Sequence, residues 1–125
     1  MDQTYRVEVV ALPGENRGDY LLEDITALGI LGVERVERSD LYFLRGALTS
    51  DDVALLCNEL LADPVVQRAR WGLATDPVAT PAGAVRVEVG LLQGVTDSVA
   101  GNLLARAQLL GVGGMRAAAS AQSYL

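Results

Sequence analysis

The sequence predicts an α+β fold in which helices cover one face of an antiparallel sheet. Segments with the period-2 alternation of strands are interleaved with segments whose apolar residues recur at helical spacing. The chain also repeats itself, because the motif Arg-Val-Glu-Val at residues 6–9 returns at residues 86–89. Two copies of one small unit are therefore expected. Further matches, after a shift of two residues, are Leu21-Leu22 with Leu103-Leu104, Leu28-Gly29 with Leu110-Gly111, Gly32 with Gly114 and Tyr42 with Tyr124.

The first copy opens with a strand and a helix. Residues 6–12 alternate between apolar and charged side chains, which predicts a half-buried strand that Pro13-Gly14 ends. A helix is expected over residues 18–30, with Gly29 or Gly32 at its end. The residues that share its apolar stripe, and are expected to be buried, are Leu21, Ile25 and Leu28.

A hairpin is predicted next. Residues 33–38 alternate again, and Val36 is expected to be buried. Ser39-Asp40 has the composition of a turn, and residues 41–44 are expected to form the returning strand. This order places a β-hairpin between the first helix and the second.

A second helix and a last strand complete the copy. Thr49 or Ser50 is the expected N-cap, and Asp63-Pro64 ends the helix, because a residue before proline is disfavoured in helical conformation. Residues 65–72 then alternate as a strand. The resulting order, β-α-β-β-α-β, is that of the ferredoxin-like unit. The apolar residues expected on the buried stripe of the second helix are Val53, Leu56, Cys57 and Leu60.

The domain organisation follows from the repeat. Residues 1–72 form the complete unit, residues 73–84 have the composition of a linker, and residues 85–125 form a partial second copy. This copy is expected to have a strand over 85–92, a helix over 97–110 and a strand over 115–125. Candidates for the N-cap of its helix are Thr96, Asp97 and Ser98.

Composition excludes several classes of protein. The chain has 125 residues and a net charge of −6, with no basic footprint for a nucleic acid. Its apolar runs are too short to span a bilayer, and the N-terminus lacks the basic region of a signal peptide. A single cysteine suits a reducing compartment. We therefore expect a cytoplasmic protein that binds neither membrane nor nucleic acid.

The chain is also a poor candidate for an independent enzyme. It contains no histidine, and all ten of its basic residues are arginine. The usual general base, the commonest metal ligand and the phosphate-loop lysine are therefore absent. We expect no catalytic residue, no metal ligand and no cofactor in this chain.

Three features could carry chemistry, and each has a simpler structural interpretation. Cys57 lies on the apolar stripe of a helix, so a buried structural cysteine is favoured over a nucleophile. The glycines at 111–114 follow a helix, whereas a phosphate loop precedes one, so they are expected to end it. Glu23-Asp24 and Asp51-Asp52 are expected to be solvated carboxylates on helix surfaces.

The two aligned tyrosines leave two interpretations open. Tyr42 and Tyr124 either pack on neighbouring strands or anchor another subunit. The open end of the second copy favours at least a dimer, because uncovered strand edges and apolar faces recruit other chains. The residues expected at such interfaces are Leu41, Tyr42, Phe43, Leu44, Val87, Val89, Leu91 and Tyr124.

Taken together, these residues resemble a known family. The strand Arg-Val-Glu-Val, the later "Leu-Gly-Ile" at 28–30 and "Asp-Pro-Val-Val-Gln" at 63–67 are similar to the PurS subunit of phosphoribosylformylglycinamidine synthase. Residues 87–97 resemble the same family, and tandem units of this kind are similar to the N-terminal region of longer PurL-type synthetases. A single-copy member would end near residue 72 and a tandem form would continue past Leu125, so we expect the chain to be part of a longer polypeptide.

The resemblance implies a non-catalytic role in purine biosynthesis. The enzyme uses ATP and glutamine-derived ammonia to convert a formylglycinamide ribonucleotide into its amidine. The PurS-like part would join the PurL-type synthetase to the glutaminase subunit. None of the ATP-binding or glutaminase residues of the family maps onto this chain.

A regulatory domain of the ACT type has the same element order and is the alternative. Such a domain would bind a small ligand, such as an amino acid, at the turns that contain Gly14 and Gly94. RNA recognition is disfavoured, because the chain has one phenylalanine and a negative net charge.

Overall fold

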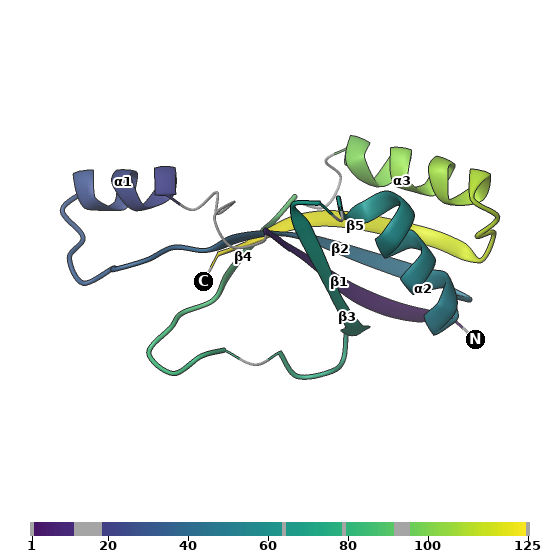
Figure 1. Ribbon diagram of the computed structural model, residues 1–125, viewed down its shortest axis with the longest axis horizontal. Coiled ribbons are helices and arrows are strands. Elements are labelled where there is room, and N and C mark those ends of the chain that lie inside the picture. Colours follow the sequence, from purple (N-terminus) through teal and green to yellow (C-terminus); the bar gives the residue numbers. More distant parts are fainter. Residues whose placement is uncertain (1, 12–18, 64, 79, 92–95, 125) are drawn as a thin grey trace.

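The computed structural model describes residues 2–11, 19–63, 65–78, 80–91 and 96–124 (Figure 1). Over these residues it has an α+β architecture with a five-stranded antiparallel sheet and three α-helices. The elements, in order, are β1 (Gln3–Ala11), α1 (Asp19–Ala27), β2 (Arg38–Gly46), α2 (Ser50–Leu56), the π-helical turn η1 (Cys57–Leu61), β3 (Gln67–Leu73), β4 (Val87–Gly90), α3 (Ser98–Leu109) and β5 (Met115–Tyr124).

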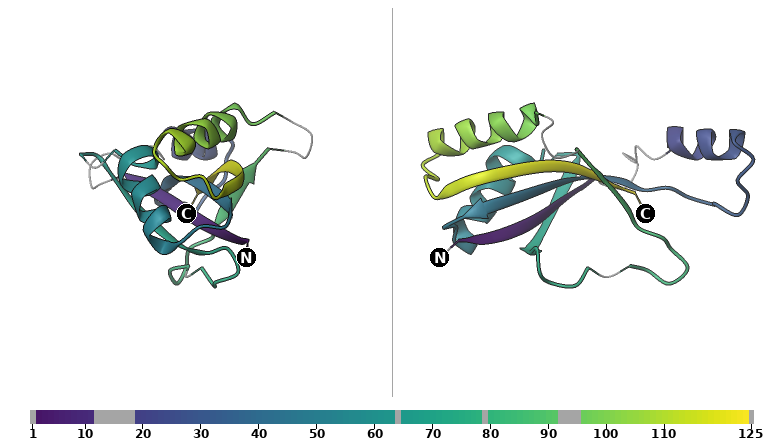
Figure 2. Two further views of the ribbon diagram at one scale, coloured as in Figure 1. Left: turned by 90° about the vertical axis from the view of Figure 1, so that its right-hand side faces the viewer. Right: turned by 180° about the vertical axis from the view of Figure 1, so that it is seen from behind.

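The strand order in the sheet is β3-β1-β2-β5-β4, and every adjacent pair is antiparallel. Helices α2 and α3 lie side by side on one face of the sheet, as Figures 1 and 2 show. Helix α1 stands apart from them, at the other end of the long axis of the molecule (Figures 1 and 2). The helix layer therefore covers only part of the sheet.

The main core lies between this helix layer and the sheet. On the strands it contains Val7, Val9 and Leu44, all of which are buried. Alternation along β1 turns Val7 and Val9 to the same side, which is the side of the helices. The helices contribute Val53, Leu56, Cys57, Leu61, Leu103 and Ala107 to the same core.

The predicted core stripe of the second helix is largely confirmed. Val53, Leu56 and Cys57 are buried, and Leu60 packs against the core while remaining partly exposed. The helix begins with a capping box at Thr49. The backbone N–H of Asp52 donates to the Thr49 hydroxyl (3.1 Å), and the Asp52 carboxylate accepts from the N–H of Thr49 (3.0 Å).

The predicted hairpin over 33–44 is wrong. Residues 33–37 form no strand, and β2 runs without a break through Ser39 and Asp40, where a turn was expected. Both residues pair with β1 on one side, opposite Val10 and Val9, and with β5 on the other. Two neighbouring strands can satisfy the backbone of a polar pair, which overrides its turn preference.

The first helix is also less buried than predicted. The structure places α1 at Asp19–Ala27, but Leu21 and Ile25 are only partly buried and Leu28 is 77% exposed. The apolar stripe is present in the sequence, yet α1 packs on neither α2 nor α3 (Figure 1). Val36, in contrast, is buried as expected.

The second half of the chain matches its predicted elements closely. The boundaries of β4, α3 and β5 fall within two residues of those expected, and Asp97 is the N-cap of α3. The helix ends as its glycines predict, because Gly111 has a φ of +86° that favours glycine. Gly114 is needed for a different reason, since a Cβ there would overlap the carbonyl oxygen of Ala47.

The two sequence segments that align with one another adopt the same strand register. Val7 lies opposite Tyr42 in the β1–β2 pair, and Val87 lies opposite Tyr124 in the β4–β5 pair. The neighbouring positions follow the same rule, with Glu8 opposite Leu41 and Glu88 opposite Ser123. Between these pairs, β2 and β5 run antiparallel with Asp40 opposite Gln122, which are themselves aligned positions. The strands β1-β2 and β5-β4 are thus arranged around a local two-fold axis.

Candidate functional site

The side chains of most chemical interest lie on the face of the sheet that carries no helix. Because Val7 and Val9 point toward the helices, Arg6 and Glu8 point to the opposite face. Glu8 is only 5% exposed, which is unusual for a carboxylate unless it is paired. Its partners come from three separate parts of the chain.

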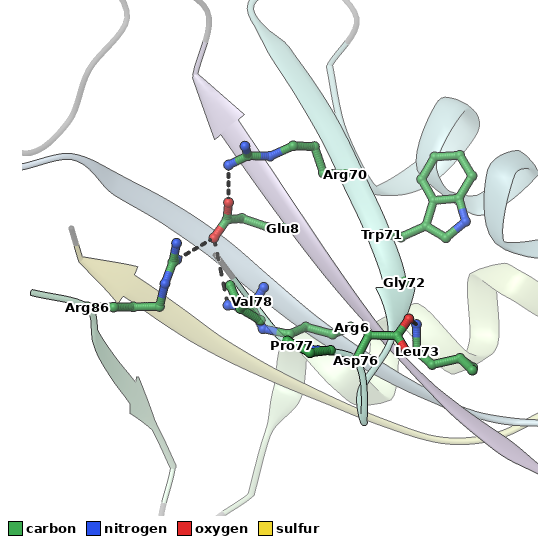
Figure 3. Close-up of a pocket in the computed structure, with 10 residues that line it drawn as sticks. All are labelled: Arg6, Glu8, Arg70, Trp71, Gly72, Leu73, Asp76, Pro77, Val78 and Arg86. Carbon is green, nitrogen blue, oxygen red and sulfur yellow. Dashed lines mark hydrogen bonds and ion pairs between the residues drawn. The ribbon is translucent and has the colours of Figure 1, made fainter. Parts of the chain in front are cut away.

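Three guanidinium groups surround the Glu8 carboxylate. Arg70, from β3, pairs with Glu8 Oε1, and Arg86 Nη1 donates to Glu8 Oε2 at 3.0 Å. Arg6 Nη2 lies 3.8 Å from the same Oε2. The carboxylate therefore joins β1, β3 and the residue that precedes β4 (Figure 3).

The repeated motif makes these contacts reciprocal. Arg86, in the second motif, pairs with Glu8 in the first, and Arg6 in the first pairs with Glu88 in the second, at 2.5 Å. Each Arg-Val-Glu-Val segment thus provides one cation and one anion to the other. Arg86 Nη1 also donates to Ser123 Oγ at 3.2 Å, which brings β5 into the same network.

A pocket of about 320 Å³ opens beside this network (Figure 3). One wall is formed by Arg6, Glu8, Arg70 and Arg86, and the other by β3 and the chain that follows it. Asp76 closes that end, where its carboxylate accepts from the backbone N–H of Leu73 at 3.2 Å. The remaining lining residues are Trp71, Gly72, Leu73, Pro77 and Val78.

The network can bind and orient charged groups through its guanidinium groups and the Glu8 carboxylate. Each oxygen of the Glu8 carboxylate is already engaged by a guanidinium group, Oε1 by Arg70 and Oε2 by Arg86. Glu8, Glu88 and Asp76 also balance the charge of the three arginines. The arrangement therefore serves better as a clasp between strands than as a catalytic centre.

Cys57, the candidate nucleophile from the sequence, does not line this pocket. It is buried in the core beneath α3, and burial raises the pKa of its thiol to about 11. A thiol of that pKa is protonated at neutral pH and is a poor nucleophile. Within the described residues, no three His, Cys, Asp or Glu side chains converge to form a metal site.

Asp97, the N-cap of α3, accepts hydrogen bonds from both α3 and β5. Its carboxylate accepts from the backbone N–H of Ala100 (3.0 Å), and from the N–H and hydroxyl of Ser120. Burial alone would raise the pKa of this carboxyl, but hydrogen bonds from Ala100 and Ser120 outweigh it and lower the pKa below 3.8. Asp97 thus joins α3 to β5.

Replacing Asp97 by Ala should lower the free energy of unfolding at pH 7 by about 1–2 kcal/mol, the usual cost of a lost N-cap. Because the folded pKa is depressed, the ionised carboxylate stabilises the fold above pH 3.8, and this contribution is lost as the pH falls through the folded value. Urea denaturation at several pH values should therefore show the two proteins converging in acid. Asp51→Ala, at an exposed carboxylate in α2, is the control, and a pH-independent difference would contradict the prediction.

The residues predicted to form interfaces divide into two groups. Leu41 and Leu44 are wholly buried within the single chain, and Tyr42 and Phe43 are partly buried. The second group remains accessible. Its members are Val87, Val89 and Leu91, which are exposed, and Tyr124, which is partly buried.

The arginine–glutamate network was not predicted from the sequence. One signal was present, because the repeat preserves the charged residues of its motif as well as the valines. Charged residues that only face solvent can differ between the two copies of a repeat. The return of Arg and Glu in the second copy therefore indicates that these side chains make contacts. Arg70 carries no comparable signal, since it has no aligned counterpart in the second segment.

Two earlier candidates lie outside the described residues, namely the turns at Pro13-Gly14 and Gln93-Gly94. None of the described helices is long and apolar enough to cross a membrane. Comparisons with protein-family models, with curated proteins and with solved structures find no match to this chain.

Proposed function

We propose that this chain is a non-catalytic assembly domain of phosphoribosylformylglycinamidine synthase, built from a ferredoxin-like PurS-like unit and a partial second unit. It would join the PurL-type synthetase to the glutaminase subunit in ATP- and glutamine-dependent amidine formation. The proposal starts from the resemblance of residues 6–72 and 86–125 to the PurS family.

One structural observation carries the proposal further than the sequence does. The two aligned segments pair their strands in the same register and share reciprocal ion pairs, Arg6–Glu88 and Arg86–Glu8. A two-fold scaffold of this kind supports a role in holding other parts together. The protonated thiol of Cys57 and the balanced charges at Glu8 agree with a chain that performs no chemistry itself.

The test uses the synthetase and glutaminase of the same organism. Adding the chain to both proteins is expected to give a stable ternary complex and to raise amidine formation from glutamine. Amidine formation from free ammonia should change little, because ammonia bypasses the transfer between subunits. Failure to form the complex would contradict the assembly role.

The chain alone provides the matching control. It should hydrolyse neither glutamine nor ATP, and Cys57→Ser should leave this background unchanged. Glutamine hydrolysis that disappears in the Cys57→Ser variant would show a catalytic function and overturn the proposal.

A ligand-sensing role of the ACT type is the second candidate, and the pocket beside Glu8 favours it. Its volume of about 320 Å³ suits a molecule the size of an amino acid, and its arginines could pair with a carboxylate. Calorimetric titration with free amino acids distinguishes the two roles. Saturable binding that is lost in Arg70→Ala would favour the sensor.

A further inference from the structure

The two halves of the sheet differ in how well their helix-facing side is covered. In the β1–β2 half, Val7 and Val9 are 0% and 2% exposed. In the β4–β5 half, Val87 and Val89 occupy the same register positions but are 51% and 50% exposed. Equivalent apolar side chains are therefore covered in one half and open to solvent in the other.

The covering element of the first half is the continuous helix formed by α2 and η1. Its apolar residues Val53, Leu56, Cys57 and Leu61 share one buried cluster with strand residues of β1 and β2 and with Leu103 and Ala107 of α3. One amphipathic helix thus buries both the strand valines and the apolar stripe of its neighbouring helix. Among the described residues, no helix does this for the β4–β5 half.

The helix that would neighbour such an element in the second half is α1. Leu21-Leu22 of α1 align with Leu103-Leu104 of α3, and Leu103 is buried whereas Leu21 is only partly buried. The apolar residues that follow α1 are exposed as well, namely Leu28, Ile30 and Leu31. Around the local two-fold axis, α1 and α3 lie at opposite ends of the sheet on the same side (Figure 1).

We propose that the β4–β5 half is a docking site for an amphipathic helical segment built like α2–η1. That segment would lie on the strands beside α1, covering Val87 and Val89 with one side and contacting Leu21 and Ile25 with the other. Its occupant is a polypeptide with apolar residues at the spacing of Val53, Leu56, Cys57 and Leu61, supplied from outside these 125 residues. Strand register and side-chain exposure point to this docking site whether or not the chain belongs to the enzyme proposed above.

The test extends the protein with its own covering element. Leu125 aligns with Phe43, so a copy of residues 44–73 is appended directly after Leu125. Amide hydrogen exchange of α1 is then compared with that of the unextended chain. We expect α1 amides to exchange about 100-fold more slowly in the extended protein, because packed helices open only with larger parts of the fold. Unchanged exchange in α1 would overturn the proposal.

A matched control carries V53D and L56D in the appended copy alone, which places charge on its apolar stripe. This variant should leave α1 as fast to exchange as in the unextended chain, and protection that survives the two substitutions would count against docking. Protection of the α3 amides shows throughout that the core formed by α2–η1, α3 and the sheet remains folded.

Two further measurements keep the test decisive. If the extended protein loses the protection of α3, the full 125-residue chain is titrated with a synthetic peptide of residues 43–61. Saturable shifts of the α1 and β4 amide resonances would support the site, and their absence would refute it. If the unextended chain dimerises on concentration and protects α1 in doing so, the occupant is a second molecule of this chain and the proposal is wrong.

Discussion

Replacing Glu8 by Gln is expected to lower the free energy of unfolding by about 3–5 kcal/mol, the cost of removing one partner from a buried ion pair. The carboxylate is buried among Arg6, Arg70 and Arg86, and the side chains of Arg6 and Arg86 are themselves largely buried. Gln retains the size of the side chain but not its charge. Arg86 would then lose its ion pair with Glu8 in a poorly solvated position, whereas Arg6 keeps its ion pair with Glu88. Urea denaturation at neutral pH measures the cost.

Glu37→Gln is the matched control for this prediction. Glu37 pairs with Arg35, but both side chains are well exposed, so the substitution should cost less than about 1 kcal/mol. Added salt should weaken this exposed pair more than the buried network. Equal destabilisation by the two substitutions would show that the Glu8 network contributes no more than a surface ion pair.

Leu41→Ala is expected to be similarly costly, at about 2–5 kcal/mol, because Leu41 is completely buried. Its side chain shares the helix-free face with Glu8, which lies opposite it on β1, and with Ala121 on β5. Chemical denaturation of the variant measures the loss. Leu109→Ala, at an exposed leucine of α3, should change stability by no more than about 0.5 kcal/mol.

The effects of Glu8→Gln and Leu41→Ala on stability should also be coupled. Glu8 and Leu41 are direct cross-strand neighbours, and the arginine side chains that pair with Glu8 lie on the face where Leu41 is buried. The double variant should therefore lose less stability than the sum of the single losses, by about 0.5–3 kcal/mol. Strict additivity would mean that Leu41 is covered by something other than this network.

Local periodicity was sufficient to predict the position of most elements. Period-2 alternation located β1, and the stripe that begins at Val53 located α2 together with its buried face. The N-cap at Asp97 and the helix end at Gly111 follow from local backbone chemistry, so they too were accessible. These features depend on residues close together in the chain.

The errors concern contacts between distant residues. The composition of Ser39-Asp40 favours a turn, and only the pairing of β2 with β1 and β5 on its two sides explains why the strand continues. The apolar stripe of α1 specifies a helix but not what covers it, so the exposure of Leu28 could not be predicted. The Glu8 network likewise combines residues 62 and 78 positions apart.

The covalent link between the two halves of the sheet makes their contact independent of protein concentration. β3 ends at Leu73 and β4 begins at Val87, so a short connection joins the two halves of the sheet. Tethering of this kind gives the partners an effective concentration on the order of millimolar, whatever the amount of protein in solution. The β2–β5 pairing and the ion pairs of Glu8 therefore persist at extreme dilution, where two separate chains with the same contacts would dissociate.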